Sequence, residues 1–100
     1  MFRLSKVIPK IELIEFCKRH HIRKLSLFGS ALRDALQKDS DIDLLVEFEA
    51  GHTPGLMDLA GIEIGLAKMI GRRVDLRTPQ ELSRYFRKDV LSKAKVEYAA

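Results

Sequence analysis

The chain has 100 residues, of which 46% are hydrophobic and 32% are charged, and its formal net charge is +4. This length and balance predict a single soluble domain over residues 1–100 and exclude a disordered chain. The one cysteine, Cys17, cannot form a disulfide bond within the chain, which excludes a disulfide-dependent secreted domain. There is no apolar run long enough to span a membrane and no signal-peptide core, so we expect a cytoplasmic protein without a membrane partner.

The first part of the chain alternates between helix and strand patterns. Apolar residues at helical spacing predict a helix from Pro9 to His20, and Lys24 to Phe28 is typical of a short strand. Gly29-Ser30 then turns the chain, and Ser30 is a suitable N-cap for a short helix over residues 31–37. The apolar stripe of the first helix would consist of Ile11, Leu13, Ile14, Phe16 and Cys17.

The clearest strand runs from Asp41 to Phe48, because four apolar residues alternate along one of its faces. These residues are Ile42, Leu44, Val46 and Phe48. A loop from Glu49 to Gly55 leads into a strongly amphipathic helix from Leu56 to Ile70, which Gly71 would cap. The apolar side of that helix consists of Leu59, Ile62, Leu66 and Met69.

A third strand from Arg73 to Arg77 and a last helix complete the predicted elements. Thr78, Pro79 and Glu81 form a capping box with a proline in the first turn, which predicts that the helix begins there. Its buried stripe would be Leu82, Tyr85, Phe86 and Val90. From about Lys95 we expect the chain to fray, with Tyr98 in a mobile tail. The alternation of helices and strands favours α/β architecture.

Three acidic residues are candidates for a metal site. Asp41 and Asp43 are two residues apart on the predicted strand, so both carboxylates project from the face opposite its apolar residues. Neighbouring carboxylates repel each other, and a hard cation such as Mg²⁺ relieves that repulsion. If Val74 and Leu76 join the core, Asp75 lies on the same face as the other two. Three such residues could hold two metal ions for an in-line phosphoryl transfer.

The Gly29-Ser30 turn is a candidate phosphate site. Glycine lets the backbone approach a phosphate closely, and Ser30 offers a hydroxyl. The N–H groups that open the following helix favour an anion. One short helix therefore separates a phosphate cradle from a metal-binding edge, which is a workable arrangement for a metal-bound triphosphate.

These residues resemble the signature of the DNA polymerase β-type nucleotidyltransferase superfamily: Gly29-Ser30, ten residues, Asp41-x-Asp43, and Asp75 on a later strand. The segments Leu27 to Asp34 and Ser40 to Val46 are similar to those of its smallest members, the minimal nucleotidyltransferases. The resemblance covers about half of the chain, roughly Leu25 to Thr78. It implies an α/β (α+β) nucleotidyltransferase fold, with a small mixed β-sheet of about three strands and helices packed on one face.

The resemblance also implies a function. Asp41 and Asp43 would ligate Mg²⁺, Asp75 would complete the site and help to activate the attacking hydroxyl, and Gly29 and Ser30 would hold the triphosphate. Minimal members are often antitoxins paired with a helical HEPN-type RNase toxin, which they are thought to modify with AMP at a tyrosine. We therefore expect a nucleotidyltransferase that uses ATP and two Mg²⁺ ions to AMPylate a HEPN toxin.

Other functions stay open on the sequence. A chain this short leaves little room for an acceptor-recognition domain, so the main alternative is a non-catalytic nucleotide-binding module or a steric antitoxin. A nucleic-acid-binding protein ranks last, because no helix carries a concentrated basic stripe. Asp34 departs from the small residue common in the family, and Arg33 matches a frequent arginine to which we assign no role.

The remaining polar residues have ordinary explanations. His20 and His21 suit the end of a helix, where the dipole favours a cation, and His52 suits a solvated loop. Arg72 and Arg73 would either steer a nucleotide towards the third carboxylate or form the basic end of a helix, and both interpretations remain open.

Overall fold

The computed structural model of the chain describes residues 2–29 and 40–100. These residues include a four-stranded sheet with the order β3-β2-β1-β4. Strand β1 (Ile22–Phe28) pairs antiparallel with both β2 (Ile42–Phe48) and β4 (Lys95–Ala99). Strand β2 pairs parallel with β3 (Val74–Arg77). The mixed sheet is confirmed, but the expected number of about three strands was one too few.

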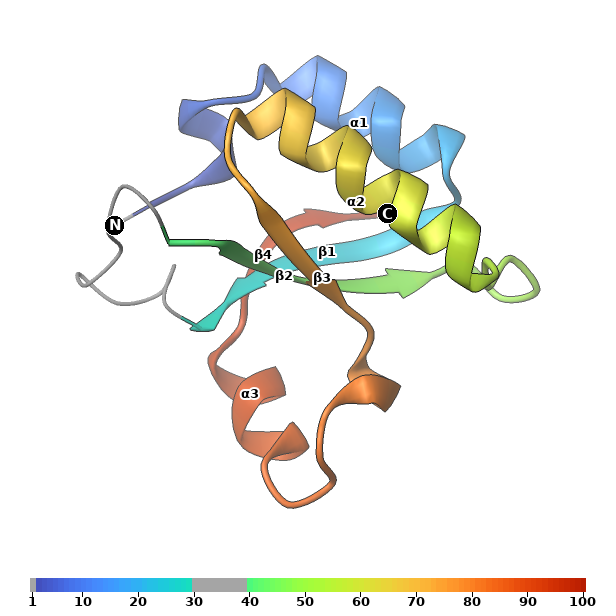
Figure 1. Cartoon of the computed structure of the whole chain (residues 1–100), viewed down its shortest axis with the longest axis vertical. Helices are drawn as coiled ribbons and strands as arrows, with labels where there is room; N and C mark the ends of the chain where they lie inside the picture. Colours follow the sequence, from blue (N-terminus) through green and yellow to red (C-terminus); the bar gives the residue numbers. More distant parts are fainter. Residues whose placement is uncertain (1, 30–39) are drawn as a thin grey trace.

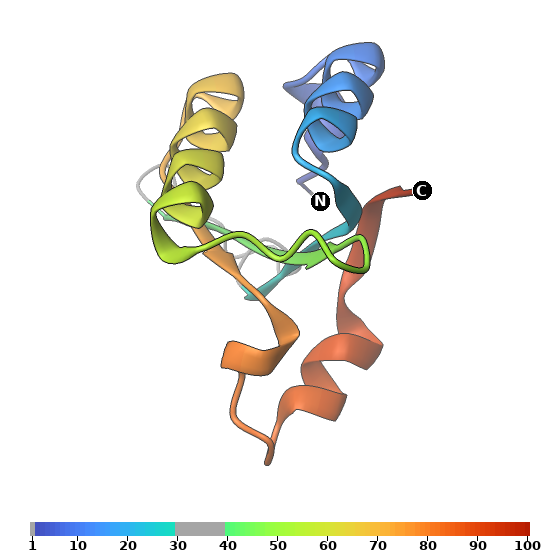
Figure 2. The same cartoon turned by 90° about the vertical axis from the view of Figure 1, so that its right-hand side faces the viewer.

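Helices α1 (Lys10–Arg19) and α2 (Leu56–Ile70) cover one face of the sheet, as expected (Figure 1). Figure 2 shows the two helices side by side above the strands and α3 (Arg87–Lys93) on the opposite side. Two short 3-10 turns, η1 (Leu4–Lys6) and η3 (Pro79–Glu81), complete the described elements. Among the described residues, no helix has the length and apolar character that crossing a bilayer requires.

The main core lies between the two helices and the sheet. Helix α1 contributes Leu13, Phe16 and Cys17, all of them buried. Phe16 packs against α2 at Gly65, where a Cβ atom would meet the ring at 3.0 Å, so this glycine allows the helices to approach closely. Ile11 was wrongly expected in the stripe and is 63% exposed. It lies two residues from Leu13, about 200° around the helix, and therefore points to solvent.

Helix α2 begins and ends where its sequence pattern predicts. Ile62 and Leu66 are buried in the core, whereas Leu59 and Met69 pack against its margin. Gly71 caps the helix in the left-handed conformation, with φ at 77°, and its N–H donates to the carbonyl oxygen of Ala67. This is the conformation that favours glycine after a helix.

The expected helix from Thr78 is the largest error in the predicted elements. The Glu81 carboxylate does accept hydrogen bonds from the N–H and hydroxyl of Thr78, but only the 3-10 turn η3 follows. The helix ends because the backbone of Leu82 is extended, with ψ at 144°, and the Arg87 guanidinium donates to the carbonyl oxygen of this residue. The Ser83 hydroxyl accepts from the N–H of Tyr85, a local contact that competes with helix formation.

The expected buried stripe of that helix is also wrong in part. Tyr85 and Phe86 are 85% and 54% exposed, while Leu82 and Val90 are half-buried. Because the helix is broken between η3 and α3, these four residues no longer share one face.

The expected frayed end is instead strand β4, in which Tyr98 pairs with Leu25. Two long-range contacts hold this strand. The Glu97 carboxylate, almost fully buried, accepts a hydrogen bond from the N–H of Leu4 at 2.6 Å and forms an ion pair with Arg3. The N–H of Ala100 donates to the carbonyl oxygen of Arg23. No local pattern in the sequence indicates partners so distant along the chain.

Replacing Leu66 by Ala should test the core between α2 and the sheet. Leu66 has no exposed surface, so Leu66→Ala should lower the free energy of unfolding by about 2–5 kcal/mol through lost burial and a residual cavity. Urea denaturation measures this value. Met57, on the same helix, is 89% exposed, and Met57→Ala should change stability by less than about 0.5 kcal/mol. Equal effects of the two substitutions would contradict the packing described.

Cys17 should be chemically inert in the folded protein. Burial raises the pKa of its thiol to about 12, so at pH 8 the native chain holds on the order of a thousandfold less thiolate than an ordinary cysteine. Reaction with a chromogenic disulfide reagent should be correspondingly slow, and urea should accelerate it. The free energy of unfolding should also fall as the pH rises above the ordinary thiol pKa, since only the unfolded chain then releases the proton. Equal rates with and without urea would be the contrary result.

Candidate active site

Asp43 and Asp75 lie side by side on the two parallel strands. They are register partners of β2 and β3, flanked by the partner pairs Ile42–Val74 and Leu44–Leu76. Those four apolar residues are buried beneath the helices, so alternation along the strands directs both carboxylates to the face away from α1 and α2. The condition set for Asp75, that its two neighbours join the core, is met.

Asp41 lies one residue before β2 and is more exposed. Its carboxylate forms an ion pair with Arg73, with an Nε–Oδ1 distance of 3.1 Å. The backbone beside this pair is fixed as well, because the N–H of Ile42 donates to the carbonyl oxygen of Arg73. Arg72 donates to the carbonyl oxygen of Ser40 at 2.9 Å. The two arginines that follow α2 therefore hold the chain that leads into β2.

A residue that the sequence analysis did not single out, Arg77, lies beside the third carboxylate. Its Nε is 3.0 Å from Oδ1 of Asp75. Hydrogen bonding and attraction to Asp75, with a smaller contribution from Asp43, raise the pKa of the guanidinium above its usual value. Its position was a usable signal, since a residue two places after Asp75 on a strand shares the same face.

The three carboxylates do not all converge on one point. Among the described residues, one group of three histidine, cysteine or acidic side chains has ligand atoms that all lie within 4.8 Å of one another. None of the three aspartates belongs to this group. The ion pairs with Arg73 and Arg77 account for this arrangement, because each holds one carboxylate. A divalent cation would have to exchange with these guanidinium groups.

Gly29 is packed directly against Asp43. Its φ is +67°, and a Cβ atom there would overlap the Oδ2 atom of Asp43. The end of β1 thus needs glycine for its backbone conformation and for the space around a carboxylate. Ser30, Arg33, Asp34 and the short helix expected over 31–37 lie outside the described residues.

These residues fit a hard divalent cation. Asp43 and Asp75 supply oxygen ligands from adjacent positions, and Gly29, which has no side chain, leaves space for the carboxylate of Asp43. Mg²⁺ prefers such oxygen donors and commonly takes one or two carboxylates together with substrate phosphates. Metal-holding carboxylates are a recurring part of phosphoryl-transfer sites, so this arrangement fits the class of domain that binds and transfers nucleotide phosphates.

Comparison with known proteins agrees with this class. Residues 10–97 match the model of the nucleotidyltransferase domain family. A Methanocaldococcus jannaschii protein, provisionally named a protein adenylyltransferase, is 32% identical over 85% of this chain and 89% of its own. Protein adenylyltransferase MntA of Thermococcus cleftensis is 36% identical over 77% of this chain and 76% of its own. The chain therefore belongs to the nucleotidyltransferase domain family.

Solved structures confirm the fold. One that is provisionally described as a minimal nucleotidyltransferase has a TM-score of 0.69 and 36% identity, with 85% of each chain covered. The complex of a tri-AMPylated Shewanella oneidensis HEPN toxin with an MNT antitoxin has a TM-score of 0.64 at 19% identity, covering 91% of this chain and 70% of that one. The second likeness concerns the fold alone.

Replacing Gly29 by Ala should test its contact with Asp43. Gly29→Ala should combine the cost of a left-handed alanine, about 1–2 kcal/mol, with displacement of the Asp43 carboxylate. Gly51 is the matched control, because its φ is +80° and a Cβ atom there would meet nothing within 4 Å. In urea denaturation, Gly29→Ala should therefore cost at least about 1 kcal/mol more than Gly51→Ala. Equal costs would show that the contact with Asp43 is unimportant.

Proposed function

We propose that this protein is a Mg²⁺-dependent protein adenylyltransferase that transfers AMP from ATP to a tyrosine of a HEPN-type toxin and thereby acts as its antitoxin. The observation that carries the proposal is the register pairing of Asp43 with Asp75 beside Gly29. Two relatives with adenylyltransferase names and membership of the nucleotidyltransferase family support the reaction type. The AMPylated HEPN toxin in complex with an MNT antitoxin supports the partner.

In this proposal the carboxylates hold the cation. Asp43 and Asp75, with Asp41 after release from Arg73, would ligate Mg²⁺, with room for two ions across the three side chains. Bound Mg²⁺ supplies neutralisation of the triphosphate charge and an orienting template for an in-line displacement. Gly29 and Ser30 would hold the triphosphate by close backbone approach and a hydroxyl group.

The acceptor would be activated beside β3. Asp75 would accept the proton of the attacking hydroxyl, while Arg77 would orient its carboxylate. A bond forms between the acceptor oxygen and the α-phosphorus, the bond to the bridging oxygen breaks, and pyrophosphate leaves. The rate enhancement would come from positioning and charge stabilisation.

The transfer experiment uses labelled ATP, Mg²⁺ and the product of the neighbouring gene, which the proposal requires to be a HEPN-type toxin. Asp43→Asn and Asp75→Asn should each reduce labelling of the toxin by at least about a hundredfold, because each removes a negatively charged ligand of the Mg²⁺ that would neutralise the phosphate charge. Asp58→Asn, on the first turn of α2, is the matched control and should leave labelling unchanged.

The same variants separate catalysis from steric inhibition. If Asp43→Asn labels the toxin at the wild-type rate, the catalytic role of the carboxylate pair is refuted. If it fails to label the toxin yet silences it as well as the wild type, the protein acts as a steric antitoxin. Mass spectrometry of the labelled toxin then identifies the acceptor, and AMP on a residue other than tyrosine would overturn that part of the proposal.

A further inference from the structure

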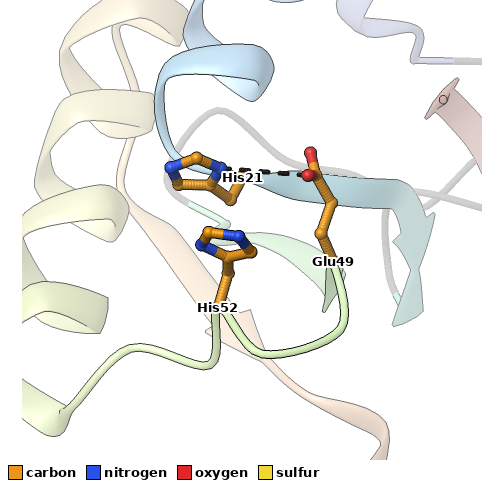
Figure 3. A group of neighbouring side chains, drawn as sticks. All are labelled: His21, Glu49 and His52. Carbon is orange, nitrogen blue, oxygen red and sulfur yellow. Dashed lines mark ion pairs between the residues drawn. The ribbon is translucent and has the colours of Figure 1, made fainter.

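A second cluster of metal-binding side chains lies at the other end of the sheet. His21 precedes β1, while Glu49 and His52 follow β2, and one ligand atom from each lies within 4.8 Å of the others (Figure 3). Glu49 is six residues beyond Asp43, which at about 3.3 Å per strand residue places it about 20 Å from the candidate active site. The cluster is therefore separate from the carboxylates of β2 and β3.

Backbone contacts fix the positions of these three residues. The N–H of Glu49 donates to the carbonyl oxygen of His21 at 2.8 Å, and the N–H of His52 donates to the carbonyl oxygen of Glu49 at 3.0 Å. The side chains also meet, with Nδ1 of His21 3.8 Å from Oε1 of Glu49. The backbone positions of the cluster thus depend on the end of α1 and on the turn after β2.

His21 occupies a backbone position that usually belongs to glycine. It is the second residue after α1 and has φ at 56°, whereas the left-handed residue after α2 is a glycine, Gly71, with φ at 77°. Among the described residues, His21 is the one non-glycine residue with a positive φ. A side chain in this conformation costs free energy, and such strain often marks a functional position.

The donor atoms of His21, Glu49 and His52 match a transition-metal ion of intermediate softness. Two imidazole nitrogens and one carboxylate oxygen are ligands that Zn²⁺ takes in proteins, with a fourth position open to water. They differ from the all-oxygen set at Asp43 and Asp75, which suits Mg²⁺. His21 and His52 also line a pocket of about 560 Å³ between the end of α1 and the start of α2, so an ion has access to them.

The two imidazole rings are stacked, with centroids 3.9 Å apart and planes inclined by 14° (Figure 3). The nitrogen lone pairs lie in the ring planes, so two nearly parallel rings cannot both point at one ion. Each ring has to rotate about its side-chain bonds for both to bind. The partial exposure of His21 and Glu49 leaves room for this rotation.

We propose that His21, Glu49 and His52 bind a divalent transition-metal ion, with Zn²⁺ the best match to the donor set. The ion would tie the end of α1 to the turn between β2 and α2, two segments that are distant in sequence. Because an unfolded chain does not hold the three ligands together, binding would stabilise the folded protein. The site is independent of the proposed transfer reaction.

The test uses tag-free, chelator-treated full-length protein and Zn²⁺ as the probe. Isothermal titration should show one saturable site, and Zn²⁺ at a hundredfold its Kd should raise the melting temperature by on the order of 10 °C. His52→Ala and Glu49→Gln should each weaken binding by more than about tenfold. The matched controls are His20→Gln, next to His21 in the sequence, and Glu15→Gln, on α1. Both should bind Zn²⁺ as the wild type does.

Two further measurements test whether Zn²⁺ binds at this cluster and not at the carboxylates of β2 and β3. Co²⁺ in place of Zn²⁺ should give the visible absorption of a tetrahedral site in the wild type and lose it in His52→Ala, with circular dichroism confirming that the variant is folded. The double variant Asp43→Asn with Asp75→Asn should retain the Zn²⁺ site. The proposal is overturned if the wild type shows no saturable binding, if His52→Ala binds equally well, or if the double variant loses the site.

Discussion

The parallel register between β2 and β3 is the constraint on which the rest of the structure depends. It pairs Ile42 with Val74 and Leu44 with Leu76 on the core face, and so brings Asp43 opposite Asp75 on the other face. A shift of β3 by one residue against β2 would turn Asp75 into the core and expose Val74 and Leu76. Burial of the core therefore fixes the position of the candidate catalytic groups, since the same hydrogen-bonded ladder carries both.

The face that carries the carboxylates needs its own charge balance. Asp41, Asp43 and Asp75 would repel one another, and the arginines at positions 73 and 77 lie among them on the same ladder. These ion pairs are partly exposed and contribute little to stability, but they hold negative side chains in place in the absence of a cation. The arginines thus occupy positions where a metal ion would otherwise supply the positive charge.

Local patterns in the sequence were sufficient to predict much of the fold and of the candidate active site. The periodicity of α2, its glycine cap and the alternation of β2 each depend on neighbouring residues alone, and all three were predicted. The shared face of Asp43 and Asp75 followed from the apolar residues beside them. The placement of Arg77 could have been predicted by the same reasoning.

The errors lie where partners are far apart along the chain. Nothing near Lys95 indicates that Glu97 meets Leu4, or that Ala100 bonds to Arg23, and β4 was therefore taken for a frayed end. The helix expected from Thr78 is an exception: its capping box is a genuine local signal, but the backbone becomes extended at Leu82 and ends the helix after one turn. The cluster of His21, Glu49 and His52 was missed because its members come together only when β1 and β2 pair.

The order of the strands also has a consequence for synthesis on the ribosome. Strand β1 is internal in the sheet, yet one of its two neighbours, β4, is made only after β2, α2 and β3. Until then its outer row of backbone N–H and C=O groups stays open to other extended chains. The nascent protein consequently passes through a stage prone to intermolecular strand addition, and the five-residue strand β4 ends that stage by occupying the open edge.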